Sequence, residues 1–119
     1  MTPNIKMKKD TTLKSPFSKE VYRKNAELYK VMANAKRLEI LNLIVDKEAS
    51  VNEISKVLGT RKSNTSQHLA YLRYVGLVTT RRQGKNIFYK ITDKRIVEPC
   101  KIFNELRASR NFKKASEVI

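Results

Sequence analysis

The sequence predicts a mainly α-helical fold with one small β-hairpin, an α+β arrangement in a single domain. Apolar residues recur at helical spacing in five segments between residues 17 and 109. Two runs of β-branched and aromatic residues flank Gly84, which indicates a pair of strands joined by a tight bend. The chain has 119 residues, of which 40% are hydrophobic, enough for one modest core but not for two.

The first part of the chain predicts a basic arm followed by two helices. Residues 1–16 are rich in Lys, Thr and Pro and have little to bury, so we expect a disordered arm. Apolar and aromatic residues at helical spacing predict the first amphipathic helix over residues 17–33. Asn34 is a favoured N-cap, and the apolar face of residues 35–45 predicts a second helix after it.

The next two helices are short and closely spaced. Ser50 and Glu53 form a capping box, in which each side chain satisfies the free backbone N–H of the other residue. This motif predicts a third helix over residues 50–58, closed by Gly59. After a brief turn, apolar residues at helical spacing predict a fourth helix over residues 63–75.

The last third of the chain predicts the hairpin and a final helix. Residues 77–82 and 86–91 are the two expected strands, which together form a basic β-ribbon. An amphipathic pattern predicts a last helix from residue 93 or a few residues later to about residue 109, with Pro99 either in its first turn or at a kink. Residues 110–119 are expected to form a C-terminal tail.

The net charge of +15, from 26 Lys and Arg against 11 Asp and Glu, makes a polyanion the first candidate partner. Residues 54–92 contain no Asp or Glu, so we expect a continuous basic surface there, with ordinary scatter of solvated lysines as the alternative. No run of about 18 apolar residues could span a bilayer, and residues 1–14 lack the apolar run of a signal sequence. The protein is therefore expected to be cytoplasmic, and nucleic acid or an anionic membrane surface would fit its charge.

The order helix, turn, helix and basic hairpin predicts a winged helix-turn-helix that binds double-stranded DNA. The helix over residues 63–75 can lie in the major groove, while the hairpin over residues 81–90 reaches the neighbouring backbone or minor groove. Asn64 and Gln67 can each make paired hydrogen bonds to adenine, and Lys62 suits guanine or phosphate. The residues expected to contact DNA are Arg61, Lys62, Ser63, Asn64, Thr65, Ser66, Gln67, His68, Arg81, Arg82, Gln83 and Lys85.

Other functions have to be weighed against sequence-specific DNA binding. A polar helix start is often merely capped and solvated, and a sequence-tolerant architectural or RNA-binding module would use the same charge. A winged domain that binds protein would lack the polar stretch of residues 62–68. An enzyme is not expected, because the chain has three glycines, one histidine and one cysteine and shows no paired carboxylates.

Residues 26–106 resemble the ArsR/SmtB family of bacterial winged-helix repressors in collinear order. Residues 33–41 (ANAKRLEIL) match the family's ADPTRLRIL opening, and residues 63–69 (SNTSQHL) match its STVSHHL recognition start. Residues 72–78 (LRYVGLV) match the LREAGLV exit into the wing, and residues 81–91 match its RREGR and YYRL strands. The resemblance implies a repressor that forms a homodimer through its first and last helices and reads a roughly palindromic operator.

The chain departs from the metal-sensing members of that family. Ser50 and Asn52 stand where one known site has a Cys-x-Cys pair, and Arg95 stands where a second site, which begins at Asp93, has histidine. With one His and one Cys, the sequence predicts neither a metal site nor a cofactor. Cys100 is expected to pack as a small apolar residue, with redox pairing across the dimer as the alternative. The effector stays open between a small molecule, a protein partner, an oxidant and none.

Overall fold

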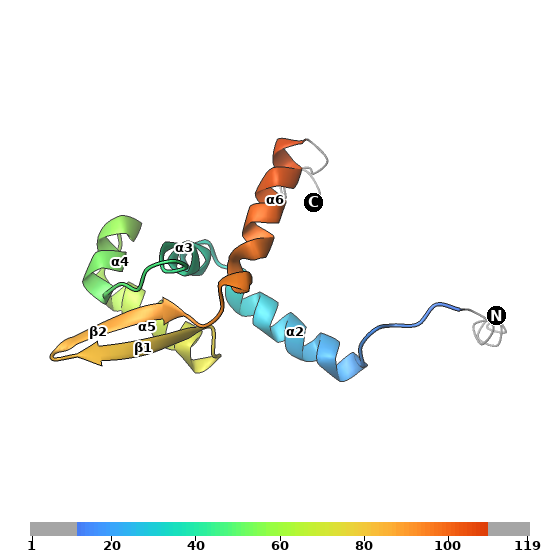
Figure 1. Cartoon of the computed structure of the whole chain (residues 1–119), viewed down its shortest axis with the longest axis horizontal. Helices are drawn as coiled ribbons and strands as arrows, with labels where there is room; N and C mark the ends of the chain where they lie inside the picture. Colours follow the sequence, from blue (N-terminus) through green and yellow to red (C-terminus); the bar gives the residue numbers. More distant parts are fainter. Residues whose placement is uncertain (1–11, 110–119) are drawn as a thin grey trace.

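Residues 12–109 are described by the computed structural model of the chain, so the predicted tail and most of the predicted N-terminal arm lie outside the described residues. Within that range, helices precede and follow a single hairpin (Figure 1). The elements are α2 (Lys19–Met32), α3 (Ala35–Leu43), α4 (Val51–Leu58), α5 (Lys62–Tyr74), β1 (Val78–Gln83), β2 (Asn86–Ile91), the 3-10 helix η2 (Lys94–Val97) and α6 (Glu98–Ala108). The predicted mainly α-helical fold with one small hairpin is confirmed.

Three local signals in the sequence begin or end helices where they were expected. The Asn34 side chain accepts a hydrogen bond from the backbone N–H of Arg37 at 3.1 Å, and α3 begins at the next residue. The capping box of Ser50 and Glu53 is present at the start of α4, with both reciprocal hydrogen bonds. Gly59 ends α4 at φ +68°, a left-handed conformation that glycine adopts without steric cost.

The hairpin is an antiparallel pair with the shortest common type of turn. Gln83 lies opposite Asn86 in the register, so Gly84 and Lys85 alone form the turn. Gly84 has φ +64°, which explains why a glycine occupies this position. β1 begins one residue later than predicted, because the N–H of Leu77 donates to a carbonyl of α5 instead of to β2.

One contact of the hairpin gave no signal in the sequence. Ala49, in the segment just before α4, forms an isolated antiparallel bridge with Tyr89 of β2. The two backbone hydrogen bonds of this bridge measure 3.0 and 2.8 Å. The bridge ties the hairpin to the start of the helix-turn-helix and places Glu48 close to β1.

The last α-helix begins at the late end of its predicted range. The Asp93 carboxylate accepts a hydrogen bond from the backbone N–H of Arg95 at 2.9 Å and starts η2, a 3-10 helix, instead of an α-helix. The α-helix α6 begins at Glu98, so Pro99 lies in its first turn, where the missing N–H of proline has no helical partner to lose. The sequence had allowed Pro99 to lie either in the first turn or at a kink, and it lies in the first turn.

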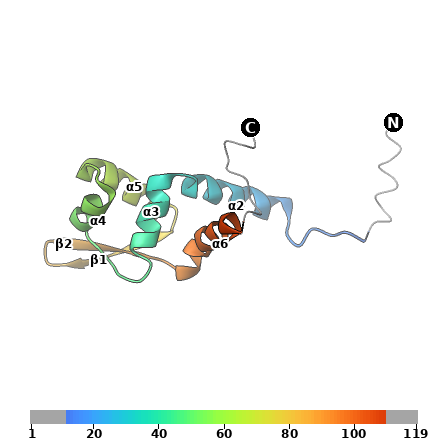
Figure 2. The same ribbon diagram turned by 90° about the horizontal axis from the view of Figure 1, so that it is seen from above.

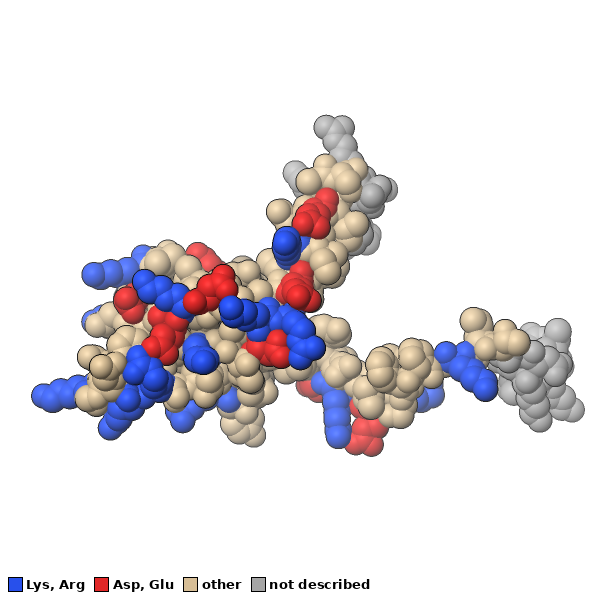
Figure 3. Space-filling model, in the orientation of Figure 1, with Lys and Arg blue, Asp and Glu red and all other residues tan. Residues whose placement is uncertain are grey.

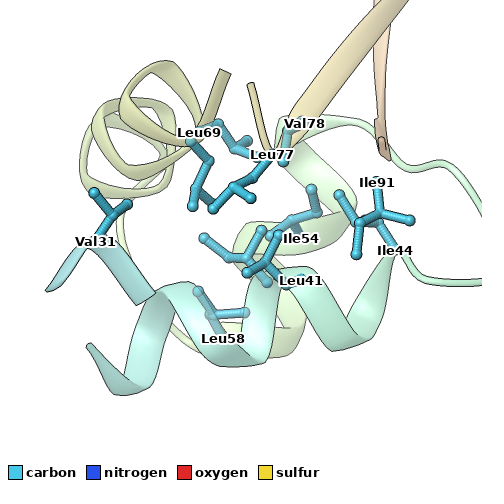
Figure 4. Packing of buried hydrophobic residues seen from close by; sticks show 11 residues of the cluster. Val31, Leu41, Ile44, Ile54, Leu58, Leu69, Leu77, Val78 and Ile91 are labelled. Atoms are coloured by element: carbon cyan, nitrogen blue, oxygen red, sulfur yellow. The ribbon is translucent and has the colours of Figure 1, made fainter. Parts of the chain in front are cut away.

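The core lies between α3, α4, α5 and the base of the hairpin (Figure 4). Its buried apolar residues are Val31, Ile40, Leu41, Ile44, Ile54, Leu58, Leu69, Leu72, Leu77, Val78 and Ile91. α2 contributes only Val31 to this core, and α6 contributes no buried residue. Both helices project from the body, in Figure 1 as two diverging arms and in Figure 2 at the end opposite the hairpin tip. No helix within residues 12–109 is long and apolar enough to cross a membrane.

The capping box makes a prediction for stability. Ser50→Ala removes the side chain that accepts the Glu53 backbone N–H, so we expect the free energy of unfolding to fall by about 0.5–2 kcal/mol. Chemical denaturation followed by circular dichroism measures this change. Lys56→Ala, at an exposed position of the same helix, is the control and should change stability by less than about 0.5 kcal/mol. Equal effects of both substitutions would contradict the role of the cap.

Candidate nucleic-acid interface

A buried cluster of hydroxyl groups holds α4 and α5 together at their turn. The Ser55 hydroxyl donates a hydrogen bond to Thr65 Oγ1 at 2.9 Å, and Thr60 Oγ1 lies 2.9 Å from the same oxygen. The backbone N–H of Thr60 also donates to the carbonyl of Ser55 at 3.3 Å. Because Ser55 and Thr65 are buried, these bonds are shielded from water and fix the direction in which α5 leaves the turn.

Thr65 corrects one of the predicted DNA contacts. Its side chain is fully buried, with 0% exposed, and its hydroxyl already bonds to the turn residues. The prediction that this hydroxyl reaches a base or a phosphate is therefore wrong. In the sequence, a threonine inside the polar stretch of residues 61–68 looks the same whether its side chain faces the groove or the core.

The opposite face of α5 is polar and unengaged. Ser63, Asn64, Ser66 and Gln67 are exposed, and their side chains form no hydrogen bond with another residue in the described part of the chain. Thr65, Leu69 and Leu72 are buried at spacings of four and three residues, so they hold the other side of the helix against the core. This packing leaves the predicted base-reading residues in contact with solvent alone.

The N-terminus of α5 adds positive charge beside that polar face. No side chain caps the helix, and its first turn contains no acidic residue. Its free backbone N–H groups and the positive end of the helix dipole therefore lie next to Arg61 and Lys62, which are both exposed. Neither side chain forms an ion pair with any residue between 12 and 109. Such a helix start favours binding of phosphate groups.

On the hairpin, Arg82 and Lys85 are exposed, whereas the neighbouring Arg81 is engaged. The Arg81 guanidinium forms an ion pair with Glu48 and lies 4.9 Å from the centroid of the Phe88 ring. The hydrogen bond from Arg81 lowers the pKa of Glu48, and the same bond raises the pKa of Arg81. Both groups therefore stay charged at neutral pH and neutralise each other locally.

This ion pair changes the expected charge pattern. Glu48 precedes the acid-free stretch of residues 54–92 in sequence, but the fold brings it onto the hairpin. In the view of Figure 3, acidic side chains lie among the basic ones over the body of the molecule. The expectation of a continuous basic surface is wrong at this point. Gln83, another predicted DNA contact, is exposed, and its Oε1 accepts a hydrogen bond from Arg81 Nη1 at 3.0 Å.

His68 is half-buried, and an arginine of α3 contacts its ring. The Arg37 Nε donates to His68 Nδ1 at 3.2 Å, and the Arg37 guanidinium carbon lies 4.4 Å from the centroid of the Tyr71 ring. Burial, followed by the positive charges of Arg37 and Lys36, lowers the pKa of His68. The ring is therefore neutral at neutral pH, and because Nδ1 accepts, its proton is on Nε2. Of the two ring nitrogens, Nε2 is the one left for a partner.

Sequence reasoning missed three of the residues that shape this surface. Arg37 contacts His68, and Glu48 contacts Arg81, each from a distance in the sequence. The Tyr71 ring lies against the Arg37 guanidinium. Arg37 falls inside the motif of residues 33–41, which is the only signal that could have singled it out. Glu48 carried no signal, since its partner lies on a different element.

The residues at the positions of the family's metal sites do not fit a metal ion. The Ser50 hydroxyl caps α4, and Asn52 is an exposed amide on its first turn. The Asp93 carboxylate is engaged by Arg95, whose Nη2 lies 2.7 Å from Asp93 Oδ2. No three side chains of His, Cys, Asp or Glu gather in residues 12–109.

Two short helices joined by a tight turn, a polar outer face on the second helix and a hairpin beside it define a winged helix-turn-helix regulator of transcription. The family model described as "Bacterial regulatory protein, arsR family" matches residues 34–80. The chain is 36% identical over 101 residues to the transcriptional activator HlyU of Vibrio cholerae, across 82% of this chain and 94% of the relative. The chain therefore belongs to the arsR family of bacterial regulators.

Two further comparisons agree with the fold and the family. The solved structure of Vibrio cholerae HlyU matches with a TM-score of 0.66 and 37% identity, over 75% of this chain and 97% of that chain. A biofilm growth-associated repressor of Xylella fastidiosa is 38% identical over 68 residues, 57% of this chain and 60% of the relative. These relatives are named as regulators of transcription, so the expectation that the chain is not an enzyme is confirmed.

A second solved structure resembles the chain in fold. The solution structure of Mb0332 from Mycobacterium bovis has a TM-score of 0.69 and 24% identity, over 87% of this chain and 99% of that chain. It is described as a homodimeric winged helix-turn-helix DNA-binding domain. At this level of identity the match supports the shared fold.

The buried hydroxyl cluster makes a second prediction for stability. Thr65→Val keeps the volume of the side chain but removes the hydroxyl that Ser55 and Thr60 contact, so we expect unfolding to become easier by about 1–3 kcal/mol. Ser66→Ala, at the exposed neighbouring position, is the control and should leave stability almost unchanged. If Thr65→Val instead weakened DNA binding with unchanged stability, the structural role of Thr65 would be refuted.

Proposed function

We propose that this protein is a homodimeric repressor that binds a pseudo-palindromic DNA operator. In each subunit α5 lies in the major groove, and the β1–β2 hairpin contacts the adjacent backbone or minor groove. The observation that carries the proposal is the outer face of α5, where four polar side chains have no partner among residues 12–109. Polar side chains on a helix surface are often merely solvated, and what favours DNA here is the position of this face beside the exposed cations Arg61 and Lys62.

The side chains of this face divide into two groups by their chemistry. Asn64 and Gln67 carry a donor and an acceptor on one amide, which suits the paired acceptor and donor of adenine in the major groove. Ser63 and Ser66 suit bases or phosphates, and Lys62 suits guanine or phosphate. On the wing, Arg82 and Lys85 are exposed cations that suit the phosphate backbone. Arg81 is the least available cation, because Glu48 neutralises it.

The dimer rests on the two projecting helices. On α2, Val21, Tyr22 and Tyr29 are exposed, and on α6 Ile102 is 50% exposed. An apolar hollow of about 590 Å³ lies between α2, α3 and the start of α6 and includes Cys100 in its lining. A monomer of this size rarely leaves so much apolar surface uncovered, and a second copy related by two-fold symmetry would cover it. The homodimer described for Mb0332 supports the same assembly.

Dimerisation also explains how the operator is read. Two α5 helices related by a two-fold axis can enter successive major grooves, about 34 Å apart, of a two-fold symmetric site. Repression follows from occupancy, since a dimer bound across a promoter excludes polymerase from it. Both an activator and a repressor occur among the relatives, so the position of the operator relative to the promoter decides the direction of control. Such a regulator acts in the cytoplasm on the bacterial or archaeal nucleoid.

The division into base-reading and phosphate-binding residues is testable by substitution. Asn64→Ala or Gln67→Ala should weaken operator binding by about 1–3 kcal/mol and relax the base preference. Arg82→Ala or Lys85→Ala should weaken binding to operator and random DNA alike and lower the slope of log K against log salt by about one. The operator is first selected from a random DNA pool at about 150 mM salt, and fluorescence anisotropy then measures each affinity.

The same experiment tests the rival function. A sequence-tolerant architectural or RNA-binding module would yield no motif from the random pool and would bind every duplex equally. An operator-reading dimer should prefer its site about a thousandfold or more over scrambled DNA. Equal losses on operator and random DNA for all four variants would refute the proposed repressor.

The dimer interface makes a further prediction. Ile102→Arg places a charge on the exposed apolar face of α6, so we expect the dimer to dissociate to subunits of 13.8 kDa. The core of α3, α4, α5 and the hairpin should stay folded, because α6 contributes no buried residue to it. Light scattering after gel filtration gives the mass, and circular dichroism gives the helix content. Val57→Arg makes the same exchange at an exposed position of α4 and should leave the dimer intact. A dimer that survived Ile102→Arg would place the interface elsewhere.

A further inference from the structure

Arg37 joins three helices through a single side chain. Its Nη1 donates to the backbone carbonyl of Val31, near the end of α2, at 3.1 Å. Its Nε donates to His68 Nδ1 of α5 at 3.2 Å, and its guanidinium carbon lies 4.4 Å from the centroid of the Tyr71 ring on the same helix. Arg37 itself belongs to α3, so the three contacts connect α2, α3 and α5.

We propose that Arg37 is a positioning residue that holds the DNA-reading helix α5 in a fixed orientation to the arm helix α2, and so sets the operator spacing that the dimer accepts. The inference rests on the proposed dimeric function. α2 projects from the body as one of the two arms proposed to form the dimer, and α5 carries the polar face proposed to read bases (Figure 1). Any rotation between these helices changes the separation of two reading faces in a dimer.

The chemistry of each contact suits this role. The carbonyl of Val31 lies in the last turn of α2, where carbonyls lack a helical partner and the helix dipole attracts a cation. The planar guanidinium can donate from two nitrogens at fixed angles while one face covers an aromatic ring. His68 and Tyr71 are three residues apart and so present neighbouring surfaces of α5. Arg37 therefore contacts α5 at two points and α2 at a third, which restrains the orientation of α2 relative to α5 more than one contact could.

The core fixes the rotational phase of α5 but leaves the orientation of α2 relative to α5 less restrained. Val31 is the one residue of α2 in the core cluster, where its side chain is buried together with Leu69 of α5 (Figure 4). Leu28 and Met32 of the same helix are partly buried against this cluster. These apolar contacts hold the end of α2 on the body but restrain its orientation less, since dispersion and hydrophobic contacts have little directional preference. The hydrogen bonds of Arg37 are directional, and they lie beside these contacts.

Arg37→Lys is the decisive variant, because it keeps the positive charge but loses the planar guanidinium with its several donor nitrogens. One ammonium group cannot donate at both positions and cover the Tyr71 ring in the same geometry. On a series of operators whose central spacer is shortened or lengthened by one or two base pairs, we expect wild-type affinity to fall steeply away from the selected spacing. In Arg37→Lys we expect about tenfold weaker binding at that spacing, the scale of one charge-assisted hydrogen bond, and a much smaller loss at the others.

Matched variants distinguish loss of the positioning role from a general loss of stability or DNA binding. Arg23→Lys makes the same exchange at an exposed site of α2 and should leave the spacing profile unchanged. His68→Asn keeps an acceptor near the place of Nδ1, whereas His68→Gln moves it to the place of Nε2, so Asn should retain more of the spacing preference. In nitrogen NMR of the histidine ring, the Nδ1 signal of His68 should shift in Arg37→Lys and stay unchanged in Arg23→Lys.

A measurement without DNA distinguishes failure of this inference from failure of the proposed function. Spin labels on Ala70→Cys, in a Cys100→Ser background that is first checked to be dimeric, report the distance between the two α5 helices. We expect a narrow distance distribution in the parent and a broad one when Arg37→Lys is added. An unchanged distribution, or equal losses of affinity at every spacing, would overturn the role of Arg37. A broadened distribution in a protein that selects no DNA motif would support positioning and refute operator reading.

Discussion

The rotational phase of α5 is the constraint on which the rest of the structure depends. Thr65, Leu69 and Leu72 are buried against the body, and the hydroxyl cluster with Ser55 and Thr60 fixes the start of the helix. A helix has one phase, so burial of this side commits the other side to solvent. The polar face that we propose to read DNA is thus a consequence of core packing, and it needs no contact of its own to stay outward.

Local signals in the sequence predicted the helices and strands. Contacts between residues far apart in the chain could not be predicted from the sequence. Asn34, Ser50 and Glu53 act within three residues of themselves, so their roles could be read directly from spacing. The contact of Arg37 with His68 spans 31 residues, and that of Arg81 with Glu48 spans 33. Neither pair follows from periodicity, because each depends on how two elements pack.

The site followed the same division. The order of elements and the polar stretch of residues 61–68 were sufficient to indicate the proposed interface, since both are local properties. Thr65 could not be separated from its neighbours, because a hydroxyl suits a buried network as well as it suits a phosphate. In the sequence Arg81 is one more cation of the wing, whereas in the fold it forms an ion pair with the Glu48 carboxylate. Its stacking on Phe88 stiffens the hairpin, so this arginine serves the shape of the wing more than its charge.

In the proposed dimer, the two projecting helices make the regulator sensitive to its own abundance. α2 and α6 have 14 and 11 residues and add a single buried side chain to the core. Helices of this length are marginal in water unless their apolar face is covered, so in a lone subunit they gain little from staying formed. Ordering of these helices is then linked to association by mass action, and both rise together with subunit concentration. The rate at which the cell synthesises the protein would thereby affect how much of it is dimeric and able to bind the operator, in addition to the effect of any effector.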